Sequence, residues 1–143
     1  MHVARILEHK GERVVTAEPS TTVAEVARTL YREHIGALLL MEDGGSIAGI
    51  ISERDIIRAL ASYGEGALGM QARELMTRSP VTCTSETTVG ELMAEMTERR
   101  IRHLPVVDGG RLSGIISIGD VVKNRLDELE SEADELRHYV MGG

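Results

Sequence analysis

The sequence predicts a mixed α/β (α+β) fold in which a β-α-β-β-α unit occurs twice, packs with pseudo-twofold symmetry and is followed by a long C-terminal helix. The first observation is an internal repeat: Val15-Thr16 recurs as Val81-Thr82, 66 positions later (81 − 15). Further along, Gly49-Ile50-Ile51-Ser52 recurs as Gly114-Ile115-Ile116-Ser117, 65 positions later (114 − 49). A fixed internal period indicates a duplicated structural unit. Two such small units would each leave a sheet face bare unless they packed together.

The periodicity within each copy predicts the same order of elements. A short β-rich run at 14–16 or 81–83 precedes a helix, for which Thr22 and Thr88 are suitable N-caps. Each copy then has two apolar runs joined by an Asp-Gly-Gly turn, which is a strong hairpin signal. A second helix begins after Ser52 or Ser117. The hairpin runs are 37–41 with 47–51, and 104–107 with 112–116.

The chain divides into three consecutive segments of one integrated domain. We predict that residues 1–64 form the first repeat with a helical piece ahead of it. Residues 65–126 form a linker and the second repeat, and residues 127–143 form a C-terminal helical extension. A length of 143 residues is the usual size of one domain.

Composition limits the function classes. A formal net charge of −7 and the lack of a Lys/Arg track argue against nucleic-acid binding. No apolar stretch of signal-peptide or membrane-spanning length is present, which argues against a membrane partner. The single cysteine, Cys83, cannot form an internal disulfide, so we expect a reducing compartment, most simply the cytoplasm. An organelle stays open if a targeting peptide was removed.

The two repeated glycine motifs extend to a shared aspartate. Residues 49–55 and 114–120 both read glycine, two apolar residues, serine, two variable residues and aspartate. This pattern resembles the signature of CBS domains, and residues 100–107 are similar to the second-strand region of many CBS repeats. The resemblance covers nearly the whole chain and is closest to short stand-alone CBS-pair proteins (Bateman modules) of bacteria and plant organelles. It implies a non-enzymatic, regulatory module that binds an adenine nucleotide in clefts between its repeats and acts on an unidentified protein.

The chemistry of the serine and the aspartate also explains why this signature would suit a nucleotide. Ser52 and Ser117 are predicted where a strand turns into a helix, and free N–H groups and the helix dipole there favour a phosphate. A carboxylate three residues later can accept hydrogen bonds from both hydroxyls of a ribose. The same Ser-x-x-Asp pattern is also an ordinary helix cap that needs no ligand. Both readings stay open from the sequence.

The candidate nucleotide-binding residues lie in the two signatures and in the strands beside them. As the resemblance implies, the strands hold the base through backbone hydrogen bonds. We expect unequal sites, because Gly36-Ala37 corresponds to Arg102-His103. A small site with few basic residues suits AMP better than ATP, with ADP, NAD-type ligands and S-adenosylmethionine left open. The full set is Thr16, Ala37, Ser52, Arg54, Asp55, Thr82, Arg102, His103, Leu104, Pro105, Ser117 and Asp120.

The sequence shows no residue pattern typical of a catalytic or metal site. The five histidines show no metal-ligand spacing, and Cys83 has no motif context. We therefore expect neither an enzyme nor a metal site, and no obligatory cofactor. The alternative is a ligand-independent dimeric scaffold. An apolar seam supports a homodimer in either case, because such a seam needs a partner; it comprises Val122, Leu126, Leu129, Ala133, Leu136 and Val140.

Overall fold

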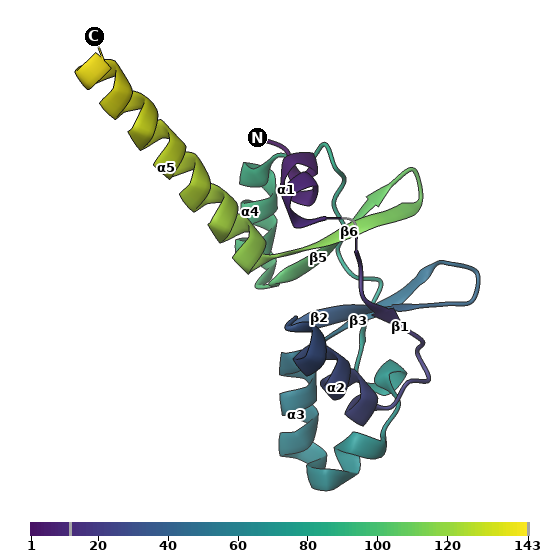
Figure 1. Ribbon diagram of the computed structural model, residues 1–143. Helices are drawn as coiled ribbons and strands as arrows, with labels where there is room; N and C mark the ends of the chain where they lie inside the picture. The colour runs from purple at the N-terminus through teal and green to yellow at the C-terminus, as the bar shows by residue number, and fades with distance from the viewer. Residues whose placement is uncertain (12, 143) are drawn as a thin grey trace. The chain divides into compact units, whose positions relative to one another are not determined.

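The computed structural model describes residues 1–11 and 13–142, and its contacts divide the chain into two compact units (Figure 1). The first unit is Arg13–Val81, and the second combines Met1–Glu12 with Thr82–Gly143. Mixed α/β structure, two sheets and a long C-terminal helix confirm the predicted fold class. Each unit is described by itself below.

The first unit is a four-stranded sheet in the order β1-β2-β3-β4. β1 pairs with β2 in parallel, whereas the β2–β3 and β3–β4 pairs are antiparallel. The predicted linker forms two 3₁₀ helices ahead of β4. The elements are β1 (Thr16–Ala17), α2 (Val23–Glu33), β2 (Ala37–Met41), β3 (Ile47–Ser52), α3 (Glu53–Tyr63), η1 (Gly64–Gly69), η2 (Ala72–Glu74) and β4 (Thr77–Arg78).

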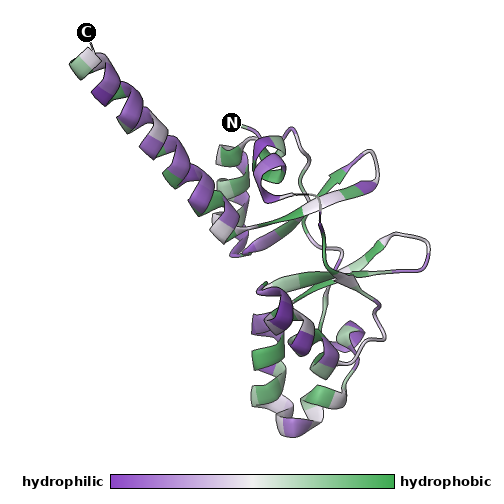
Figure 2. Cartoon of the chain, viewed as in Figure 1, coloured by the Kyte–Doolittle hydropathy of each residue, from purple (hydrophilic) through white to green (hydrophobic). Residues whose placement is uncertain are grey.

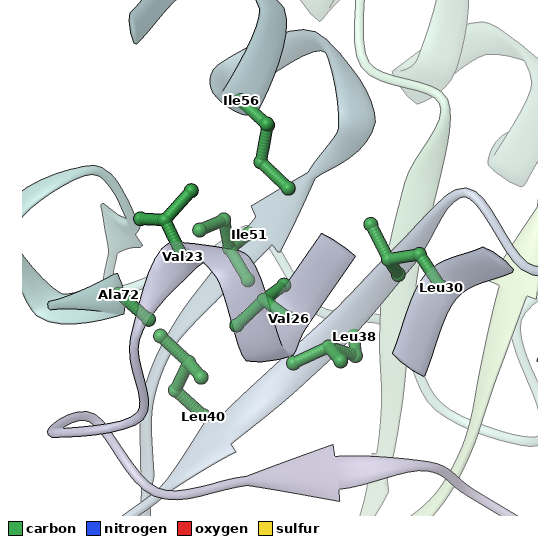
Figure 3. Packing of buried hydrophobic residues seen from close by; sticks show 8 residues of the cluster. All are labelled: Val23, Val26, Leu30, Leu38, Leu40, Ile51, Ile56 and Ala72. Atoms are coloured by element: carbon green, nitrogen blue, oxygen red, sulfur yellow. The ribbon is translucent and has the colours of Figure 1, made fainter. Parts of the chain in front are cut away.

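The core of the first unit lies between the sheet and its two α-helices. Figure 3 shows side chains from α2, β2, β3, α3 and η2 converging on one cluster. Apolar positions three and four apart give α2 one buried face, and fully burying each aliphatic side chain contributes about 1.5–3 kcal/mol. The cluster comprises Val23, Val26, Leu30, Leu38, Leu40, Ile51, Ile56 and Ala72.

The second unit repeats this order with a smaller sheet. Its hairpin, β5 with β6, is a two-stranded sheet, and the predicted strand at 81–83 is reduced to a single bridge from Cys83 to Val106. Thr88 caps α4 through the N–H of Glu91, as Thr22 caps α2, so both predicted N-caps are confirmed. The elements are α1 (Val3–Lys10), α4 (Val89–Arg99), β5 (His103–Asp108), β6 (Arg111–Ser117) and α5 (Ile118–Gly142).

The segment ahead of each repeat joins the other repeat's unit. The Val89 N–H donates to the Met1 carbonyl at 2.9 Å, and the equivalent Val23 N–H donates to the Met70 carbonyl at 2.8 Å. The N-terminal helix therefore belongs with the second repeat, although our division by sequence order placed it with the first. Sequence periodicity does not reveal this exchange, because each segment precedes one repeat along the chain but packs in the unit of the other repeat.

Figure 2 shows α5 as largely hydrophilic with isolated apolar positions along its length. The predicted seam is solvent-exposed in the single chain: Leu136 is 65% exposed and Val140 is 72% exposed. Within residues 1–11 and 13–142, none of the helices combines the length and apolar character needed to cross a bilayer.

Candidate functional site

In the first unit, the signature forms a closed helix cap where β3 meets α3. Asp55 Oδ2 accepts from the Ser52 N–H at 2.9 Å and from the Ser52 hydroxyl at 3.0 Å. The Asp55 N–H donates to Ser52 Oγ at 3.3 Å, which completes the capping box. The Glu53 N–H donates to the Gly36 carbonyl at 2.9 Å, which ties the turn to the start of β2.

In the second unit, β6 meets α5 with the same geometry. The Ser117 N–H donates to Asp120 Oδ2 at 2.8 Å, and the Asp120 N–H donates to Ser117 Oγ at 3.1 Å. The Ile118 N–H donates to the Arg102 carbonyl at 2.8 Å, as its counterpart does in the first unit. The capping interpretation of both motifs is therefore confirmed. A carboxylate has about four acceptor positions, so an aspartate that caps a helix can still accept further hydrogen bonds.

Strand register places a different residue opposite each signature serine. Ala37 pairs with Ser52 and His103 pairs with Ser117. Directly paired residues present their side chains on the same face of a sheet. One serine therefore has a methyl group beside it and the other an imidazole, so the surroundings of the two serines differ chemically.

The remaining candidate residues fall into a buried and an exposed group. Ala37, Leu104 and Pro105 are buried in their units, so their backbone rather than their side chains is the part that can meet a ligand. The Pro105 carbonyl already accepts the Cys83 N–H at 3.0 Å. The structure leaves four of the candidates exposed at the surface: Thr16, Arg54, Thr82 and Arg102.

Lys10 is a neighbour of the second signature that sequence reasoning missed. Its Nζ lies 2.7 Å from Asp120 Oδ2. Burial raises the pKa of the Asp120 carboxyl, but hydrogen bonds and charge from Lys10, with hydrogen bonds from Ser117, outweigh burial and hold the pKa below its ordinary value. Since this lysine was assigned to the first repeat, no sequence signal pointed to it.

Asp108 joins two parts of the second unit and was also missed. Its carboxylate accepts from the Ser85 N–H at 2.9 Å, from the Ser85 hydroxyl, and from the Ser113 hydroxyl at 2.6 Å. These hydrogen bonds hold the pKa of Asp108 below its ordinary value. The first repeat has Pro19 and Ala48 at the two serine positions (85 − 66 and 113 − 65), so this anchor is specific to the second unit.

The chemistry of Cys83 does not favour a nucleophile. Burial, and then the negative charge of Asp108, raise the pKa of its thiol to about 11. The thiolate is the reactive form of cysteine. Among the residues that the structure describes, no three His, Cys, Asp or Glu side chains are grouped to hold a metal ion.

The profile of the CBS-domain family matches residues 4–62 and again residues 72–127. The chain belongs to the CBS-domain family. Its two matches make it a CBS pair, and the predicted resemblance is confirmed. The mitochondrial CBS domain-containing protein CBSX3 of Arabidopsis thaliana is 35% identical over 126 residues, which cover 85% of this chain and 61% of that protein. The chain thus spans about three fifths of this curated relative.

Solved structures show the same fold. A CBS-domain protein from Agrobacterium tumefaciens has a TM-score of 0.85 at 43% identity, over 87% of this chain and 92% of that one. A CBS domain pair in complex with 5′-methylthioadenosine and S-adenosyl-L-methionine has a TM-score of 0.80 at 27% identity, over 90% of this chain and 98% of that one. A CBS protein from Pyrobaculum aerophilum complexed with AMP has a TM-score of 0.75 at 28% identity, over 84% of this chain and 89% of that one.

Proposed function

We propose that this CBS pair is a non-catalytic regulatory module that binds an adenine nucleotide, with AMP preferred, through the signature serine and aspartate of its units. The observation that carries the proposal is the duplicated strand–turn–helix in which a partly exposed carboxylate lies beside a helix N-terminus. In this proposal Asp55 and Asp120 accept from ribose hydroxyls. Ser52 and Ser117 face the phosphate.

The geometry of the carboxylates supports a ribose contact. In the described part of the chain, the capping hydrogen bonds of both aspartates run through Oδ2. Oδ1 of Asp55 has the Arg58 guanidinium at 3.7 Å, beyond hydrogen-bonding distance. Each carboxylate therefore keeps one oxygen for a ligand while the other oxygen holds the helix start.

The ligand class comes from chemistry shared by the ligand-bound neighbours. AMP, 5′-methylthioadenosine and S-adenosyl-L-methionine all carry adenosine, so a common adenosine site accounts for all three. The substituent at the 5′ position separates them: phosphate, thioether or sulfonium. Arg102 and His103 beside the second signature favour the phosphate, because a guanidinium attracts an anion and repels a sulfonium.

Regulation requires a change that another protein can detect. We propose that the nucleotide alters a surface of a homodimer that an unidentified protein contacts, because a ligand acts only by distinguishing two states. The exposed seam on α5 supports the dimer. The cytoplasm stays the proposed compartment on the strength of the unpaired Cys83, although the Arabidopsis relative is mitochondrial.

The test is calorimetric titration of the purified, nucleotide-stripped chain with AMP, ATP with magnesium, 5′-methylthioadenosine and S-adenosyl-L-methionine. The proposal expects binding of AMP and weaker binding of the other three. A tighter complex with S-adenosyl-L-methionine or ATP would overturn the AMP preference alone. Failure of all four to bind would favour the ligand-independent scaffold.

A further inference from the structure

Lys10 connects the N-terminal helix to the signature of the second unit. Its ammonium donates to Asp120 Oδ2 at 2.7 Å and to the Ile115 carbonyl at 2.6 Å. The lysine and aspartate side chains are 29% and 24% exposed, so the pair is sheltered but within reach of a ligand. α1 lies beside β6 and α5 in the same unit (Figure 1). The last residue of α1 thus reaches the start of α5.

The first unit has no equivalent lysine. Ile50, the counterpart of Ile115, pairs with Thr77 of β4 in the sheet. Among the described residues of the second unit, no strand pairs with this edge of β6, and Lys10 supplies a donor there instead. Asp55 is held by the Ser52 N–H and hydroxyl. The two signatures therefore share a cap but differ in the cation that accompanies it.

We propose that Lys10 is a positioning residue of the second-unit nucleotide site, which holds Asp120 by Oδ2 so that Oδ1 faces the ribose. This inference rests on the proposed function and assigns a new residue to that site. An ammonium has three donors, and two of them are used here. Charge-assisted hydrogen bonds are roughly twice as strong as neutral ones. Lys10 therefore restrains the carboxylate in a way that Asp55 does not experience.

The same contact keeps Asp120 ionised. Burial acts to raise the pKa of Asp120, and Lys10 is a main cause of its staying low. The titratable and charged groups near Asp120 include Lys10 on α1, Arg102 just before β5, His103 at the start of β5, and Lys123 one turn further along α5. Without Lys10, protonation begins at a higher pH, and a protonated carboxyl has fewer acceptor positions for ribose hydroxyls.

The test uses the full chain carrying Asp55→Ala, so that the second unit holds the remaining intact Ser–Asp pair, with adenosine as the calorimetric probe. Adenosine carries the ribose without a phosphate, so it separates the two possible roles of a lysine. Lys10→Met is compared with Lys10→Arg, which keeps a cationic donor. Lys123→Met is the matched control, because Lys123 is the chain's other lysine and is exposed on α5.

We expect Lys10→Met to weaken adenosine binding by roughly three- to tenfold, the scale of losing one charge-assisted restraint. Lys10→Arg should retain most of the affinity, and Lys123→Met all of it. As the pH falls toward the ordinary pKa of a carboxyl, Lys10→Met should begin to lose affinity at a higher pH than its parent, because Lys10 helps to keep Asp120 ionised.

Several results would overturn the inference. Tighter adenosine binding in Lys10→Met would make Lys10 an obstacle to the ribose. If Lys10→Met weakened AMP binding but not adenosine binding, Lys10 would be a phosphate contact. If Lys10→Met and Lys123→Met weakened binding equally, Lys10 would contribute only its general positive charge. If the unmutated chain bound neither adenosine nor AMP, the proposed function itself would fail. A normal melting curve for Lys10→Met guards against a folding defect.

Discussion

Leu7 packs directly over Gly114: a Cβ built on that glycine would lie 2.6 Å from Leu7 Cδ2. Gly49, the equivalent glycine of the first unit, is even more confined, with the Met76 side chain and the Thr77 carbonyl both 2.7 Å from such a Cβ. The signature glycine is thus required for close approach by the exchanged segment. This role in packing is separate from any ligand.

The two glycines should respond unequally to substitution by alanine. Gly49→Ala should cost about 1–3 kcal/mol of unfolding free energy, the usual range for overpacking, because the backbone of β4 has to move. Gly114→Ala should cost less, since the end of a leucine side chain can turn aside. Gly90→Ala is the control: it lies in α4 with no atom within 4 Å of its Cβ position, and should be neutral or slightly stabilising. Urea denaturation measures all three, and an equal loss at Gly90 would contradict the packing account.

Acid should release the Asp108 anchor. Its folded-state pKa is lowered by hydrogen bonds from Ser113 and Ser85, so it stabilises the fold above its unfolded pKa of about 3.8 and loses that contribution as the pH falls through the folded value. Asp108→Asn should therefore lower the melting temperature at neutral pH, and this effect should shrink progressively as the pH falls below about 3.8. Asp43→Asn, at the equivalent turn of the first unit, is the matched control. If Asp108→Asn lowered the melting temperature equally at every pH, the shape of the Asp108 side chain rather than its charge would hold the two serines.

The seam on α5 should mediate the homodimer. Leu129→Glu with Leu136→Glu should convert a dimer into a monomer in multi-angle light scattering, because both side chains are exposed in the single chain and apolar. Ser131→Glu adds a negative charge off the seam and should leave the dimer intact. A monomeric unmutated chain at micromolar concentration would refute the dimer. A dimer that tolerates both glutamates would place the interface elsewhere.

The sequence predicted the parts of the fold that depend on local patterns. The hairpins, the N-caps at Thr22 and Thr88, and the strand–turn–helix at each signature serine all rest on neighbouring residues along the chain. The duplication then supplied a second, independent copy of each pattern. Repetition is what made those predictions secure.

The parts that the sequence missed depend on distant partners. β4 has two residues, so its formation is decided by the strand beside it rather than by its own propensity. Lys10 reaches Asp120 across 110 residues of chain, and no periodicity relates them. The exchange of the segments ahead of the two repeats explains both omissions, because it brings sequence-distant segments against each signature.

The central claim is that Asp55 and Asp120 bind the ribose of an adenine nucleotide as well as capping their helices. Calorimetric titration of AMP into the Asp55→Ala/Asp120→Ala double variant tests it most directly, with unliganded melting as the measure of lost capping. Loss of the first-turn carboxylate should cost about 0.3–1 kcal/mol of stability per helix. Loss of the ribose contacts should weaken AMP binding by roughly 1.5–3 kcal/mol, or about ten- to a hundredfold. A folded double variant that binds AMP as tightly as the unmutated chain would contradict the claim and leave the aspartates as helix caps alone.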